Sequence, residues 1–162
     1  ATSRPPGRRC DARLTSTARA SSANAEAFAA VRLVGGAAGL SAWLPTANKA
    51  NANDLATLDA QLWTFSALEF IPHCHAQAQP DLLQASPIVL TSTLEDSAQL
   101  PHHQVLVNLD MNLPMGFEKF ERVVEVVTLD EEERQQARRR WKHYADRGYP
   151  IVRHDLALKE SA

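Results

Sequence analysis

Three residues in the C-terminal part of the sequence form the clearest candidate binding site. Arg134, Arg138 and Trp141 follow one another at steps of four and three residues, which places them on one stripe of a helix. A guanidinium group pairs with a carboxylate through two parallel hydrogen bonds, and an indole ring supplies apolar area beside it. The pattern therefore predicts a site for a carboxylate attached to an aromatic or aliphatic group, as at the end of a peptide chain.

Two other interpretations of this stripe stay open. The same spacing is typical of a solvent-exposed basic face, on which Glu131 or Glu133 pairs with the arginines along the helix. A single-stranded nucleic acid, with bases stacked on Trp141, is another candidate ligand. The chain as a whole offers no strong positive field for nucleic acid, because 17 lysine and arginine residues stand against 19 acidic residues.

A second cluster, His73-Cys74-His75, has side chains that bind zinc or take part in nucleophilic catalysis, with His102 and His103 as conceivable further ligands. Neighbouring residues of an extended segment point to opposite faces, however, and no C-x-x-C or H-x-x-x-H spacing accompanies the cluster. No phosphate-binding G-x-x-x-x-G-K sequence and no nucleophile elbow occur. We therefore expect a structural role for this cluster, with no metal, no cofactor and no catalytic residue.

These residues need a scaffold, and the hydrophobic pattern predicts one of the α/β class. Continuous apolar runs are typical of strands that are buried on both faces of a sheet. Strands are predicted at 40–44, 87–90, 105–109 and 123–127, with a short edge strand at 70–72 before a loop at 76–84. Alternation of such strands with helices favours a three-layer sandwich with a mainly parallel central sheet and helices on both faces.

Three helices are predicted from capping residues and apolar spacing. The first begins after Asp54 as N-cap and places four apolar residues on one face, namely Leu55, Leu58, Leu62 and Phe65. A short second helix at 116–122 turns Phe117 and Phe120 inward. The third begins at the capping box Asp130-x-x-Glu133 and runs to about Arg147, before Gly148.

The length of 162 residues indicates a single domain. Residues 1–36 are rich in alanine, arginine and serine, and we expect an atypical, weakly packed segment there, followed by the domain at 37–162. The two cysteines, Cys10 and Cys74, are far apart in the sequence and no secretory signal is evident, which favours a reducing cytoplasm. No apolar run approaches the roughly 18 residues that a membrane span requires.

Several stretches match a known family in order and spacing. The most specific are L-D-x-x-L-W at 58–63, F-I-P-H at 70–73 and A-R-x-R-W-K-x-Y at 137–144. On these motifs the chain resembles, from about residue 40 to 156, the chi subunit of the bacterial DNA polymerase III holoenzyme, an accessory protein of the clamp loader. Residues 1–36 depart from the short strand and helix with which chi-like chains usually open.

The resemblance implies a non-catalytic adaptor in DNA replication with two partners. One is the psi subunit, which ties chi-like proteins to the clamp loader, and the other is the acidic, phenylalanine-terminated tail of the single-stranded DNA-binding protein. The tail pocket of the family carries over to Arg134, Arg138, Trp141, Trp63 and Phe70. For Trp63 and Phe70 core packing is the alternative role. Contact with DNA is expected to be mostly indirect, with direct binding of single-stranded nucleic acid as the alternative function, and no membrane partner is expected.

Overall fold

The computed structural model describes residues 42–45, 52–64, 72–92, 94, 100–127 and 130–153. These residues form a five-stranded sheet with the strand order β2-β3-β1-β4-β5, in which every pairing is parallel. The strands are β1 (Ala42–Pro45), β2 (His73–His75), β3 (Ile88–Thr91), β4 (Val105–Asn108) and β5 (Arg122–Glu125). The helices are α2 (Ala52–Thr64), α3 (Pro80–Ala85), the 3-10 turn η2 (Phe117–Lys119) and α4 (Glu131–Asp146). The predicted α/β class and parallel sheet are confirmed.

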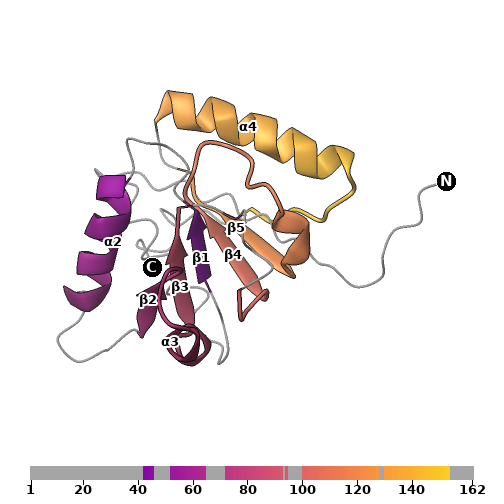
Figure 1. The fold of residues 1–162 in the computed structure, drawn as a ribbon. Coiled ribbons are helices and arrows are strands. Elements are labelled where there is room, and N and C mark those ends of the chain that lie inside the picture. Colours follow the sequence, from indigo (N-terminus) through magenta and orange to yellow (C-terminus); the bar gives the residue numbers. More distant parts are fainter. Residues whose placement is uncertain are drawn as a thin grey trace, which may run out of the picture.

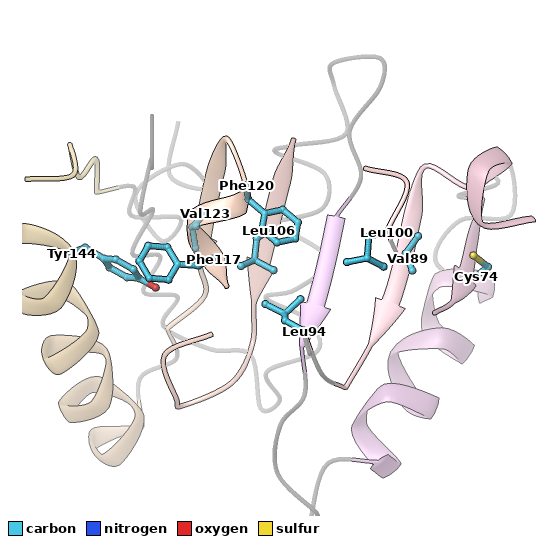
Figure 2. Packing of buried hydrophobic residues seen from close by; sticks show 9 residues of the cluster. All are labelled: Cys74, Val89, Leu94, Leu100, Leu106, Phe117, Phe120, Val123 and Tyr144. Atoms are coloured by element: carbon cyan, nitrogen blue, oxygen red, sulfur yellow. The ribbon is translucent and has the colours of Figure 1, made fainter. Parts of the chain in front are cut away.

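Alternate residues of the strands fill two separate hydrophobic clusters, because successive side chains of a strand point to opposite faces. One cluster joins Leu58 and Leu62 of α2 to the sheet, through Ile88, Leu90, Val105, Val107, Val124 and Val126. The other takes the intervening residues Val89, Leu106 and Val123, together with Tyr144 of α4 (Figure 2). The purple helix α2 and the orange-to-yellow helix α4 therefore belong to different faces of the sheet (Figure 1).

Helix α2 begins at Ala52, so the prediction of Asp54 as its N-cap is wrong. Aspartate is favoured both at the cap and in the first turn, and residue type alone does not decide between the two places. The predicted apolar face is correct for Leu58 and Leu62, which are buried, and Leu55 packs at the edge of the same cluster. Phe65 lies outside the described residues.

The region between α2 and β3 differs most from the prediction. The edge strand of the sheet is β2 at His73–His75. Of the segment 70–72 predicted as a strand, Pro72 directly precedes β2, and residues 70 and 71 lie outside the described residues. The predicted loop at 76–84 contains α3, which begins at Pro80. A proline is well accommodated in the first turn of a helix, because its missing N–H has no acceptor within the helix there. Pro80 followed by Asp81 is thus a helix start and not a loop signal.

The last part of the chain follows the prediction closely. Asp130 caps α4, and its Oδ1 accepts hydrogen bonds from the backbone N–H groups of Glu132 at 2.9 Å and Glu133 at 3.1 Å. The helix ends at Asp146, and Gly148 follows it with a φ of 75°. The predicted helix at 116–122 is reduced to the single turn η2, although Phe117 and Phe120 are both buried as expected.

None of the helices in the described part of the chain combines the length and the apolar character that crossing a membrane would require.

Candidate peptide-binding site

Helix α4 presents two different surfaces. Successive residues of an α-helix are turned by about 100°, so Ala137, Arg140 and Tyr144 share one side, and all three are buried. Arg134 and Arg138 lie on another side of the helix and are exposed. Trp141 falls between the two sides and is half-buried.

The two exposed arginines converge on one carboxylate. Arg134 Nη1 lies 3.3 Å from Glu131 Oε2, and Arg138 Nη1 lies 3.3 Å from Glu131 Oε1. The three side chains retain 45% (Arg134), 63% (Arg138) and 59% (Glu131) of their exposure. The predicted pairing of Glu131 with the arginines is therefore present, at offsets of three and seven residues. The guanidinium groups of Arg134 and Arg138 are called the arginine stripe below.

Trp63 lies on a different helix, in the last turn of α2, and is 56% exposed. Its ring centroid is 4.8 Å from that of His73 in β2, at an interplanar angle of 55°. Core packing therefore does not account for Trp63. Phe70, the other aromatic residue predicted for the pocket, lies outside the described residues.

The His73-Cys74-His75 cluster ties α2 to the edge of the sheet. Asp59 Oδ1 lies 3.2 Å from His73 Nε2 and 3.3 Å from His75 Nε2. Cys74 is buried, with its Sγ 4.0 Å from the carbonyl oxygen of Leu82 in α3. Within the described ranges, no group of three or more His, Cys, Asp and Glu side chains is arranged to hold a metal ion. The contact of Asp59 with these histidines was not predicted. Its place one turn before Trp63, in the L-D-x-x-L-W motif, was the available sequence signal.

A buried polar network that was not predicted from the sequence anchors α4 to the sheet. Glu125, at the end of β5, is 1% exposed. Its Oε2 accepts a hydrogen bond from Arg140 Nε at 2.9 Å and its Oε1 one from the Tyr144 hydroxyl at 2.6 Å. Asn108 Nδ2, the register partner on β4, lies 3.2 and 3.1 Å from the two carboxylate oxygens, and Arg140 Nη1 also donates to the Met111 carbonyl.

Burial and neighbouring polar groups act in opposite directions on the ionisation of the Glu125 carboxylate. Burial raises the pKa of Glu125 above its ordinary value, and the positive charge of Arg140 and the hydrogen bonds from Tyr144 and Asn108 act in the opposite direction. A carboxylate inside a run of β-branched residues was the sequence signal for this network, because a buried acid requires partners. The network fixes the rotation of α4 and so directs the arginine stripe away from the sheet.

The family model described as "DNA polymerase III chi subunit, HolC" matches residues 22–152. The chain belongs to the chi subunit family. The DNA polymerase III subunit chi of Pseudomonas aeruginosa is 31% identical over 120 residues, which cover 73% of this chain and 76% of that protein. The family resemblance drawn from the sequence motifs is thereby confirmed.

The chi family is that of a replication accessory subunit of DNA polymerase III, and these names indicate no catalytic role. The chi-type motif at 137–144 contains Arg138 and Trp141 as well as the anchoring residues Arg140 and Tyr144. The motif therefore combines outward-facing and inward-facing side chains on one helix.

A solved structure, that of the C-terminal domain of the DEAD-box protein Dbp5, shares the fold. The TM-score is 0.59 at 15% sequence identity, and the match covers 90% of each chain. At this identity the likeness concerns the α/β architecture alone.

Proposed function

We propose that this chi-family chain is a non-catalytic replication adaptor that binds the acidic C-terminal tail of single-stranded DNA-binding protein and links it to the clamp loader of DNA polymerase III. The psi subunit is the proposed partner on the clamp-loader side. The tail site implied by the family resemblance comprises Arg134, Arg138, Trp141, Trp63 and Phe70. Our proposal depends on Arg134, Arg138 and Trp141 of α4, because Trp63 belongs to α2, which packs on the other face of the sheet, and Phe70 lies outside the described residues. We also propose an atypical N-terminal segment at 1–36 and a chi-like α/β domain at 37–162, a three-layer sandwich with helices on both faces of its sheet; the family model itself matches from residue 22.

The observation that carries this proposal is the arginine stripe itself. Arg134 and Arg138 already hold one carboxylate between them, on an exposed side of α4. A carboxylate at the end of a partner chain can take the place of Glu131 between the same two guanidinium groups. Trp141, half-buried on the neighbouring side, offers an apolar edge for the residue that bears that carboxylate.

The exposure of the site favours selective binding over high affinity. Its cations are exposed to water, so ligand ion pairs that stay solvated contribute little free energy, and only a carboxylate that is hydrogen-bonded directly to a guanidinium group contributes more. Such charges speed the encounter with an acidic partner and select against neutral or basic chain ends.

Titration with a short acidic peptide that ends in phenylalanine tests the proposal. Arg138→Ala is expected to weaken binding by about 1.5 to 3 kcal/mol, or roughly 10- to 150-fold in Kd, because a hydrogen bond to a charged group is lost. Amidation of the peptide terminus should have a similar effect. Arg139→Ala is the matched control, because it removes the same charge from an exposed residue of α4 whose guanidinium contacts Gln136.

Two results would contradict tail binding. If the acid and the amide bind equally, the terminal carboxylate has no part in recognition. If Arg138→Ala and Arg139→Ala weaken binding equally, only the overall charge matters. Direct binding of single-stranded DNA with a steep dependence on salt, unaffected by an excess of the peptide, would favour the nucleic-acid alternative instead.

A further inference from the structure

We propose that Glu131 is an internal competitor of the tail site, whose carboxylate occupies the arginine stripe until a ligand replaces it. This inference rests on the proposed function and concerns the regulation of the same site. A ligand carboxylate that engages Arg134 or Arg138 through Nη1 competes with Glu131 for that donor. The measured affinity is then a difference between two carboxylates and not the full strength of the new contact.

The geometry makes Glu131 a weak occupant. Each of its oxygens accepts one hydrogen bond of 3.3 Å from a different guanidinium group, so neither arginine uses its two-pronged fork. More than half of the Glu131 side chain and of the Arg138 side chain stays in contact with water. A ligand carboxylate that engages the fork of Arg138 with two shorter bonds gains more than the single bond it replaces.

Position on the helix separates Glu131 from its acidic neighbours. At about 100° per residue, Glu131 lies on the same stripe as Arg134 and Arg138, whereas Glu132 is turned to another side. Both glutamates lie in the first turn of α4 and interact similarly with the helix dipole. Glu132→Gln is therefore a control for Glu131→Gln with the same change of charge, the same isosteric side chain and the same turn of the helix.

The test is titration of full-length wild type, Glu131→Gln and Glu132→Gln with the acidic phenylalanine-terminated peptide. Glu131→Gln is expected to tighten binding about two- to fivefold relative to Glu132→Gln, the range that an exposed ion pair accounts for. The salt dependence should also become steeper in Glu131→Gln. In the wild type one ion pair is exchanged for another, whereas in this variant new ion pairs form without the loss of old ones.

A double-variant cycle ties the effect to the arginines. In an Arg134→Ala, Arg138→Ala background, Glu131→Gln should have no advantage over Glu132→Gln, because the competing contact is already gone. Thermal unfolding of each variant, followed by circular dichroism, verifies that the helix is intact.

The outcomes separate this inference from the proposed function. Equal affinities of the two glutamine variants would overturn the competitor role, and weaker binding by Glu131→Gln would show that Glu131 orients the arginines for the ligand instead. In either case a large loss with Arg138→Ala leaves tail binding intact. If Arg138→Ala has no effect, tail binding by this stripe fails, and the inference fails with it.

Discussion

Helix α4 takes part in two kinds of carboxylate–guanidinium contact, one buried and one exposed. The Arg140 pair with Glu125 is 2.9 Å long, and its side chains are 6% and 1% exposed. The Glu131 contacts with Arg134 and Arg138 are 3.3 Å long and largely exposed. Position on the helix, and not residue type, therefore decides whether an arginine stabilises the fold or remains accessible to a ligand.

Contact with water explains why the buried and the exposed ion pairs contribute differently to stability. A buried ion pair has given up its hydration, so the removal of one partner leaves an uncompensated charge in a low-dielectric interior. An exposed pair has water as an alternative partner on both sides, and its loss is almost without cost. Three predictions test this contrast.

The largest effect is expected for Arg140→Ala. This variant leaves the Glu125 carboxylate buried without its cation and frees the Met111 carbonyl, so we expect a loss of about 3 to 5 kcal/mol in the free energy of unfolding. Urea denaturation followed by circular dichroism measures it. Arg139→Ala, at the adjacent and exposed position, should change the same quantity by less than about 0.5 kcal/mol. Similar values for the two variants would show that Glu125 and Arg140 do not anchor α4.

A smaller effect is expected for Tyr144→Phe. The variant keeps the ring, whose centroid is 5.1 Å from that of Phe117, but removes the hydroxyl that donates to Glu125. The loss of a hydrogen bond to a charged group predicts a destabilisation of about 1.5 to 3 kcal/mol in the same urea experiment. Tyr144→Leu removes the aromatic contacts as well and should cost more. If the two variants are equally stable, the ring contributes nothing beyond its hydroxyl.

The smallest effect is expected for Arg138→Ala. Because its contact with Glu131 is exposed, the free energy of unfolding should change by no more than about 0.5 kcal/mol. The same variant is expected to weaken peptide binding, so binding and stability are separable at Arg138. A loss of stability comparable to that of Arg140→Ala would remove the distinction between the two sides of the helix.

The features predicted correctly from the sequence are those that local chemistry determines. The N-cap at Asp130 depends on backbone groups two and three residues away, and the Arg134, Arg138 and Trp141 stripe depends only on helical periodicity. The runs at 105–109 and 123–127 could be recognised as strands because both of their faces are buried. Signals with two meanings, such as aspartate near the start of α2 or the proline in the first turn of α3, led to the errors.

The network around Glu125 could not be predicted, because its members come together only through the topology. Asn108 and Glu125 are 17 positions apart and meet because β4 pairs with β5 in that register. Arg140 and Tyr144 then reach the same carboxylate from α4. The place of Trp63 beside His73 has the same origin, since it requires α2 to return to the edge strand. Periodicity indicates which way a side chain points but not what it meets.

Arg140 joins three parts of the molecule, since it belongs to α4 and donates both to Glu125 of β5 and to the Met111 carbonyl in the segment after β4. These contacts fix the orientation of α4 once the protein has folded. An arriving ligand then pays little entropy to order its receptor. Association with such a surface is governed by diffusion and by electrostatic attraction, without a slow conformational search.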